Sequence, residues 1–219
     1  MAQGYVKAID LPQVIPVFPL PGAILLPRGQ LPLNIFEPRY LNMIDDAMAG
    51  DRIIGMIQPT IGPRSLPSLS PVGCAGRITS FAETSDGRYL VTLTGCARFR
   101  LASELPTQTP YRQIRADFTP FEADLSAPEA DGAALDRENL LEALGAYLET
   151  RGLDIDWDTA EGAPPEALIN SLSMALPFEG PEKQALLEAV SLDDRAAVLT
   201  ALLRIDAADS GDGEPQSMQ

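Results

Sequence analysis

The feature that most constrains the fold of this chain is a long alternation of apolar and polar side chains across residues 88–101. One face carries Tyr89, Val91, Leu93, Gly95, Ala97, Phe99 and Leu101, and the other carries Arg88, Thr92, Thr94, Arg98 and Arg100. A period of two predicts a long β-strand with one face buried in a core. Gly95 allows this strand to bend, as a small barrel or a strongly curved sheet requires.

Other extended segments surround this strand. They are predicted at residues 14–22, which end in a turn, and at residues 31–36, 53–57, 74–83 and 111–118. Pro16 and Pro32 lack the N–H that a strand ladder uses, so both are predicted at a sheet edge. The Asp86-Gly87 pair predicts a hairpin turn before the long strand. The first half of the chain is therefore predicted to be mainly antiparallel β-structure with one helix.

That helix is predicted to begin at Pro38, directly after the apolar run 31–36. Proline suits the first turn of a helix, and Glu37 places a negative charge at its positive end. With Glu37 as the cap, Phe36 and Leu41 have the spacing of a hydrophobic staple. We expect Glu37 and Arg39 to brace this corner between strand and helix.

From residue 133 the apolar period becomes helical. One stripe runs from Leu140 to Leu148, and a second follows the Pro164-Pro165 pair. These amphipathic segments with short connections predict a helical bundle. The predicted organisation is a β domain at 1–122, a linker at 123–132, the helical bundle at 133–206 and a disordered acidic tail at 207–219. The predicted fold class is α+β.

The charge is strongly negative and unevenly distributed. The formal net charge is −15, from 16 Lys and Arg against 31 Asp and Glu, and most of the acidic residues lie beyond residue 120. Such a chain is predicted to bind neither nucleic acid nor an anionic membrane surface, because both require clustered cations. The sequence shows no apolar run of the roughly 20 residues that span a bilayer, and its N-terminus does not have the layout of a signal peptide. A cytoplasmic location is therefore expected.

A search for reactive groups predicts no catalytic residue, no metal site and no cofactor. The chain contains no histidine, which is the commonest general base and metal ligand. It has no G-x-x-x-x-G-K-[ST] phosphate loop and no G-x-S-x-G nucleophile turn. Cys74 and Cys96 each occur as Gly-Cys-Ala within a predicted strand, which favours two buried small side chains. They would form a redox pair only if their thiols faced one another within bonding distance.

Several motifs together resemble the N-terminal substrate-binding domain of Lon proteases. They are Ile15–Pro21, Leu31–Tyr40, Asp86–Tyr89, Gly95–Phe99, Leu176–Phe178 and Glu182–Glu188. The resemblance covers about residues 13–205 and implies a PUA-like antiparallel β pseudo-barrel followed by a helical bundle. Lon proteases continue into an ATPase module and a Ser–Lys peptidase, and this sequence stops before either. The resemblance therefore implies a stand-alone binding protein without either activity.

The resemblance also implies recognition of unfolded or partly folded proteins or peptides, with a Lon-type protease as a further partner. The predicted role is a binding module for exposed apolar segments, acting as an adaptor or a chaperone-like factor. The predicted contact residues are Pro27, Leu31, Ile61, Leu66 and Leu69, several of them in the proline-rich loop 59–71. Two alternatives stay open. One is a small-molecule or peptide-modifying enzyme with a pocket between barrel and bundle, and the other is a structural partner protein whose acidic bundle docks on a basic surface.

Overall fold

The computed structural model describes residues 4–60, 62, 67–126 and 136–211. The chain forms two compact units. The β unit comprises Met1–Pro128 and Leu176–Leu187, and the helical unit comprises Glu129–Ala175 and Glu188–Gln219. The division differs from the predicted one, because a segment from the predicted bundle belongs to the β unit.

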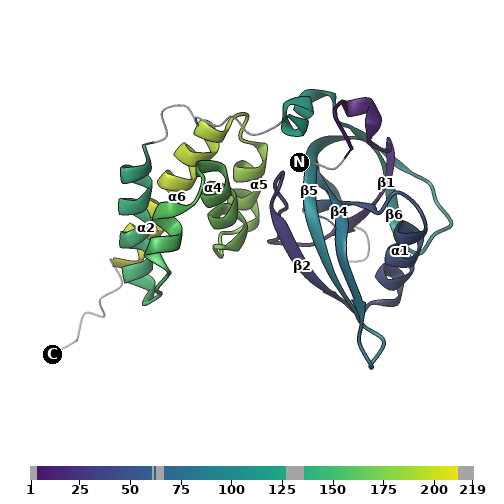
Figure 1. Ribbon diagram of the computed structural model, residues 1–219, viewed down its shortest axis with the longest axis horizontal. Coiled ribbons are helices and arrows are strands. Elements are labelled where there is room, and N and C mark those ends of the chain that lie inside the picture. The colour runs from purple at the N-terminus through teal and green to yellow at the C-terminus, as the bar shows by residue number, and fades with distance from the viewer. Residues whose placement is uncertain (1–3, 61, 63–66, 127–135, 212–219) are drawn as a thin grey trace. The chain divides into compact units, whose positions relative to one another are not determined.

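Six strands build the β unit. They are β1 (Val14–Pro19), β2 (Gln30–Ile35), β3 (Ile53–Pro59), β4 (Leu69–Glu83), β5 (Tyr89–Leu105) and β6 (Arg112–Asp117). Their order is β2-β5-β4-β3-β1-β6, and a further pairing of β5 with β6 closes five of them into a barrel. Strand β5 can do this because its first half pairs with β2 and its second half pairs with β6. The long ribbons β4 and β5 are visible in Figure 1.

The sheet is mainly antiparallel, as expected, but it contains one parallel pair. Strands β1 and β3 run parallel, because a long connection that includes β2 and a helix lies between them. The predicted edge position of Pro16 is wrong for the strand as a whole, since β1 lies between β3 and β6. Pairing with β3 begins only at Val17, so Pro16 lies where β1 is paired with β6 alone. The missing N–H is therefore tolerated there.

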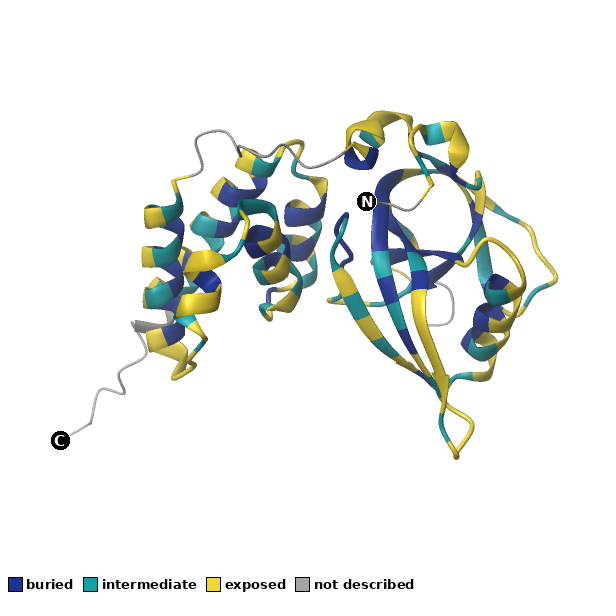
Figure 2. Cartoon of the chain, viewed as in Figure 1, coloured by how far each residue is buried: buried dark blue, intermediate teal, exposed yellow. Residues whose placement is uncertain are grey.

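The alternation predicted for the long strand holds between Tyr89 and Thr94, where Val91 and Leu93 are buried. From Gly95 to Phe99 every residue is buried, so this part of β5 is covered on both faces, and it is dark blue in Figure 2. Gly95 leaves no room for a side chain, because an added Cβ would lie 2.0 Å from the carbonyl oxygen of Leu26. The short apolar run before Pro27 therefore crosses β5 at van der Waals distance.

Helix α1 (Pro38–Ala49) begins and ends as predicted, with Glu37 as its cap and Gly50 at its end. Glu37 and Arg39 form an ion pair of 2.8 Å at the corner. The predicted hydrophobic staple is wrong, because Phe36 is 63% exposed. The inward face of α1 is instead supplied by Tyr40, Met43, Ile44 and Ala47.

Five further helices follow in the part of the chain that the structure describes. They are α2 (Arg137–Arg151), α3 (Trp157–Gly162), α4 (Pro165–Ala175), α5 (Gly180–Glu188) and α6 (Leu192–Gly211), and two 3₁₀ turns, η1 (Ala8–Asp10) and η2 (Thr119–Leu125), lie in the β unit. Asp136 and Asp156 cap α2 and α3 by accepting backbone N–H bonds. At the start of α6, the Asp194 carboxylate accepts from the Ser191 N–H and the Ser191 hydroxyl accepts from the Asp194 N–H, which forms a capping box.

Trp157 begins the short helix α3, because Asp156 caps that turn. Helix α6 continues to Gly211, so the first residues of the predicted tail are helical. Within the part of the chain that the structure describes, no helix is both long and apolar enough to cross a bilayer.

Candidate binding groove

A large groove lies within the β unit and has a volume of about 990 Å³. We call it the proline–tyrosine groove after the rings that line it. Six prolines contribute, namely Pro19, Pro21, Pro59, Pro67, Pro110 and Pro181. They come from the ends of β1 and β3, the loop before β4, the residues before β6, and the start of α5. Proline clusters at these positions because the strands end there and no ladder needs its N–H.

Tyr40 and Tyr111 line the groove while only 6% of each residue is exposed, so they form its floor rather than its rim. The Tyr40 ring lies 4.3 Å from the Phe18 ring, centroid to centroid. The Tyr111 hydroxyl donates a 2.6 Å hydrogen bond to Asp46 on α1. Burial, helped by this bond to a carboxylate, raises the pKa of Tyr111 to about 12. Both rings are thus fixed before any ligand arrives.

Two glutamines join α5 to the barrel wall. The Gln58 amide nitrogen donates to the Gly180 carbonyl and to the Gln184 side chain, both at 3.0 Å. The Gln58 oxygen accepts from the Gly22 N–H, and Gln184 donates to the Val72 carbonyl. Because Gln58 is 3% exposed, these bonds compensate a buried amide that would otherwise be costly. They hold the start of α5, and with it Pro181, against the barrel.

Two arginines supply the charged groups among the described lining residues. Arg39 pairs with Glu37, and its guanidinium carbon lies 4.5 Å from the centre of the Tyr40 ring. Arg112 makes a two-pronged contact with Glu104, at 2.6 and 2.7 Å, and donates to the Pro67 carbonyl at 2.7 Å. Among the described residues, no carboxylate lines the groove itself.

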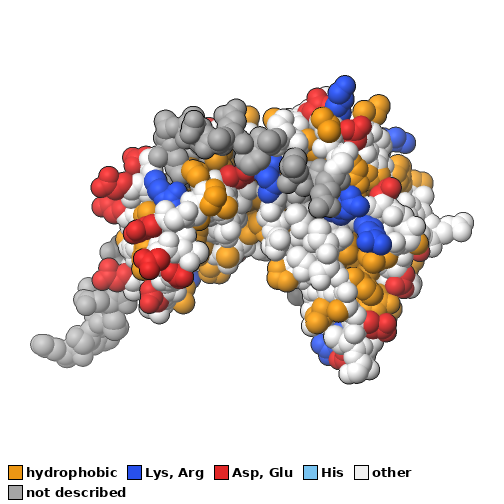
Figure 3. All heavy atoms as spheres, in the orientation of Figure 1, with side chains coloured by type: hydrophobic (Ala, Val, Ile, Leu, Met, Phe, Trp, Pro, Cys, Tyr) orange, Lys and Arg blue, Asp and Glu red, His pale blue; other side chains and the backbone are white. Residues whose placement is uncertain are grey.

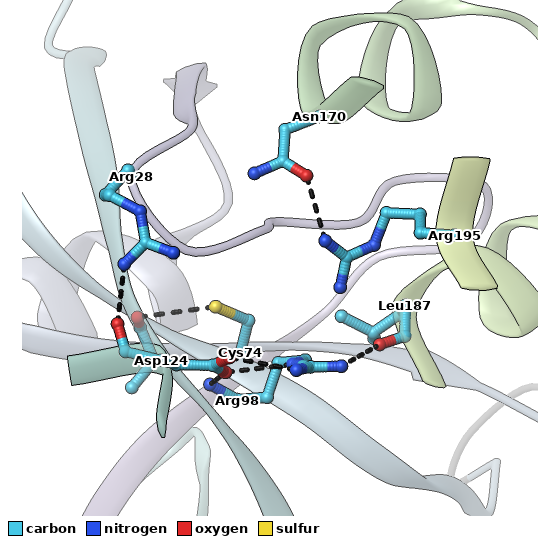
Figure 4. Close-up of polar contacts among 8 residues, drawn as sticks. Arg28, Cys74, Arg98, Asp124, Asn170, Leu187 and Arg195 are labelled. Atoms are coloured by element: carbon cyan, nitrogen blue, oxygen red, sulfur yellow. Dashed lines mark hydrogen bonds and ion pairs between the residues drawn. The ribbon is translucent and has the colours of Figure 1, made fainter. Parts of the chain in front are cut away.

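A second polar centre in the β unit is structural. Arg98 donates to both carboxylate oxygens of Asp124 at 2.8 Å and to the carbonyl of Leu187 at 3.2 Å, as Figure 4 shows. Arg28 donates to the Asp124 carbonyl. Arg98 was expected on the solvent side of β5, but it is 5% exposed. Arg98 and Arg112 are both engaged in ion pairs.

The remaining ionisable groups do not converge on the groove. Cys74 and Cys96 are buried free thiols, and burial raises the pKa of Cys96. A thiol in that environment is weakly reactive, which favours the packing interpretation. Lys183 is buried, and burial lowers its pKa to about 8, but it is not a lining residue of the groove. Within the described ranges, no group of three or more His, Cys, Asp or Glu side chains is placed to hold a metal ion.

Comparison with known families decides where this chain belongs. Residues 14–204 match the family described as the ATP-dependent protease La (LON) substrate-binding domain. The chain belongs to this Lon substrate-binding family. The resemblance suggested by its motifs is confirmed.

The curated relatives of this Lon-type chain are much longer proteins. Lon protease 2 of Myxococcus xanthus is 27% identical over 205 residues, which cover 91% of this chain and 24% of the relative. Lon protease 2 of Sorangium cellulosum is 28% identical, over 86% of this chain and 24% of the relative. The Lon-type chain thus spans about a quarter of the length of these relatives, and the matched part is the substrate-binding domain.

Solved structures show the same fold. The crystal structure of the Lon N-terminal domain protein from Xanthomonas campestris has a TM-score of 0.60 at 21% identity, covering 86% of this chain and 97% of that one. The N-terminal domain of the Mycobacterium avium complex Lon protease has a TM-score of 0.59 at 19% identity, covering 92% and 100%. The α+β class and the pseudo-barrel with helices are confirmed.

The predicted contact residues of the Lon-type chain are dispersed. Pro27 is buried beside Gly95, and half-buried Leu31 pairs with Leu93 across the sheet. Leu69 packs against the barrel core, next to the groove-lining Ser70. Ile61 and Leu66 lie outside the described residues. The structure thus does not gather the three described members of the set at one place.

The residues that form the groove were missed, although part of the signal was present. The proline-rich loop 59–71 was singled out, and Pro59, Thr60, Gly62, Pro67 and Ser70 do line the groove. Nothing local indicates that Tyr40, Tyr111 and Pro181 would meet there, because they are far apart in sequence. Tyrosine and proline on separate segments become a site only through the closure of the barrel.

Proposed function

We propose that this Lon-type chain binds extended, exposed segments of other proteins, and that the proline–tyrosine groove is the contact surface. Membership of the Lon substrate-binding family supports a protein ligand. The observation that carries the proposal is the groove itself: about 990 Å³ of open space lined by rings, with few charges. Ligand sites are typically concave, mostly apolar and largely preformed, with a few fixed polar groups.

The walls suit a polypeptide in particular. Tyrosine offers a large, rigid surface at low cost in side-chain entropy, and proline rings lose almost none. The groove is therefore preorganised, which reduces the entropic cost of binding. A folded globular partner would need a broader surface, whereas an extended segment can lie along a groove of this size.

The test is binding of a permanently unfolded protein, such as reduced and carboxymethylated α-lactalbumin, measured by fluorescence anisotropy. We expect saturable binding that is weakened at least fivefold by Pro110→Asp or Pro181→Asp. Both prolines are exposed at the groove, so the added carboxylate enters the wall without disturbing a core. Phe36→Asp is the matched control, because Phe36 is exposed in the same unit but does not line the groove.

Equal binding by all four proteins would contradict the assignment of the groove. No binding of the unfolded protein at all would contradict the function. As part of the same proposal, the bound segment is passed to a Lon-type protease in cytoplasmic quality control. Co-sedimentation of the chain with such a protease, in the presence and absence of the unfolded protein, tests that step.

A further inference from the structure

The chemistry of the groove narrows the class of segment that it accepts, and this inference rests on the proposed function. Among the described residues, no Leu, Ile, Val, Met or Phe side chain lines the groove. Among its described lining residues, the apolar surface comes from six prolines and two tyrosines. A site selecting branched aliphatic side chains would be expected to offer aliphatic pockets. This one offers flat ring faces.

The hydrogen-bonding groups of the groove are mainly donors. Both N–H groups of the Gln58 amide are used within the protein, and Gln184 is engaged with Gln58 and Val72. The arginines retain capacity, because a guanidinium has five N–H groups. Arg39 uses two of them on Glu37, and Arg112 uses three on Glu104 and Pro67. The groove thus combines ring faces with cationic donors.

One kind of polypeptide is complementary to such a surface. A proline-rich segment in the polyproline II conformation has no internal hydrogen bonds, and its prolines have carbonyl acceptors but no N–H donors. It presents flat pyrrolidine rings that pack on tyrosine, and it is already stiff before it binds. Its exposed carbonyls carry the partial negative charge that Arg39 and Arg112 can bond.

From this electrostatic and shape complementarity we infer that the proline–tyrosine groove binds proline-rich protein segments in the polyproline II conformation. Tyr40 and Tyr111 form the floor on which the ligand rings stack. Arg39, at the rim with its side chain 51% exposed, donates to ligand carbonyls. The two glutamines act as positioning residues that keep the α5 wall, including Pro181, in place.

The test uses a fluorescein-labelled dodecaproline, acetylated and amidated so that it carries no terminal charge. We expect saturable anisotropy with the full chain, and at least tenfold weaker binding of an alternating Ala-Thr peptide of equal length. Tyr111→Leu removes the ring and should weaken dodecaproline binding at least fivefold. Tyr111→Phe keeps the ring and loses the hydroxyl with its bonds to Asp46 and Gln113, so it should bind within twofold of the parent.

Because Tyr111 is buried, Arg39→Gln serves as a second probe at an exposed position, with an expected loss of at least threefold. Dodecaproline binding no tighter than that of the Ala-Thr peptide would overturn the inference. If carboxymethylated α-lactalbumin were still bound through the groove in that case, the proposed function would stand alone. Dodecaproline binding that neither Tyr111→Leu nor Arg39→Gln weakens would overturn the assignment to this groove.

Discussion

The guanidinium of Arg98 contacts two separate segments of the β unit, η2 and α5. It pairs with Asp124 of η2, donates to the last carbonyl that α5 contributes to the unit, and lies 4.7 Å from the centre of the Phe121 ring. A buried ion pair contributes little net stability compared with apolar residues, but removing one partner leaves a buried charge without compensation. Substituting Arg98 alone is therefore expected to destabilise the unit, even though the ion pair as a whole adds little net stability.

Arg98→Met should accordingly destabilise the β unit by about 3–5 kcal/mol, since Asp124 stays buried and charged. The measurement is urea unfolding followed by far-ultraviolet circular dichroism. Arg39→Met is the matched control: it breaks an exposed pair, which is worth about 0–1 kcal/mol. Equal losses of stability in the two variants would contradict the special sensitivity of Arg98.

Phenylalanine substitutions should separate exposed from buried rings. Phe36→Ala is expected to change the free energy of unfolding by no more than about 0.5 kcal/mol, because the ring is 63% exposed. Phe99→Ala should cost about 3–5 kcal/mol, because Phe99 is fully buried in the barrel core. Thermal and urea melts of the two variants test this contrast. A large loss of stability in Phe36→Ala would contradict the exposed position of Phe36 and support the predicted hydrophobic staple.

Lys183 should make stability depend on pH in the alkaline range. Burial lowers its pKa from 10.5 to about 8, so between these values the unfolded chain binds more protons than the folded chain. Stability from this group therefore rises with pH across that window, by about 3 kcal/mol in total. Below about pH 8 the full cost of burying the ammonium is present.

Lys183→Met should remove that rise, so its stability advantage over the parent shrinks between about pH 8 and pH 10.5. Lys7→Met, at an exposed lysine, is the control. Its difference from the parent in free energy of unfolding should not change with pH. The buried tyrosines, whose pKa values are raised, cancel from the comparison because all three proteins carry them. Parallel pH profiles for parent and Lys183→Met would contradict the prediction.

At the scale of elements, two glycines have opposite roles. Gly95 on β5 leaves room for the Leu26 carbonyl, and an added Cβ would lie 2.0 Å from it. Gly95→Ala should therefore destabilise by at least about 1–3 kcal/mol. Gly145 lies inside α2, where the nearest atom to an added Cβ is 3.7 Å away on Trp157.

Gly145→Ala should stabilise the helical unit by about 0.5–1 kcal/mol, because alanine has the higher helix propensity. Urea melts of both variants would test whether Gly95→Ala lowers and Gly145→Ala raises the free energy of unfolding. A neutral Gly95→Ala would show that the segment before Pro27 can move away from β5 at little cost.

Structural elements that are determined by residues close together in the sequence could be predicted. The alternation in the first part of β5, the helix cap at Glu37 and the hairpin turn at Asp86-Gly87 depend on neighbouring residues, and all were recognised. The parallel pairing of β1 with β3 depends on contacts between distant segments, and it was missed. The placement of α5 was missed for the same reason, because Gln58 and Gln184 are far apart in sequence. The groove could not be predicted for the same reason, since it forms only when the barrel closes and brings distant segments together.

At the scale of the whole molecule, charge separates the two units. The helical unit holds 18 Asp and Glu against 4 Lys and Arg, and the β unit holds 13 against 12, which together account for the 31 and 16 of the chain. Acidic side chains gather over the helices in the view of Figure 3. Like charges at this density repel one another and destabilise a compact unit.

Added salt should therefore raise the melting temperature of the helical unit by several degrees between low salt and 0.5 M NaCl, where repulsion between exposed charges is screened. The single tryptophan of the chain, Trp157, lies in this unit and reports on it selectively. The β unit holds four of the five tyrosines, and its melting, followed by the tyrosine signal of a Tyr147→Phe background in near-ultraviolet circular dichroism, should respond less. A larger shift for the β unit would contradict this account.

The position of α5 has a consequence for synthesis on the ribosome. The chain completes all six strands by Asp117, then builds α2, α3 and α4 of the helical unit before it returns to the β unit at Leu176. A nascent chain can thus close its barrel while Gln58 still lacks Gly180 and Gln184. The groove gains its last wall only after most of the protein has emerged, so binding competence is acquired late in translation.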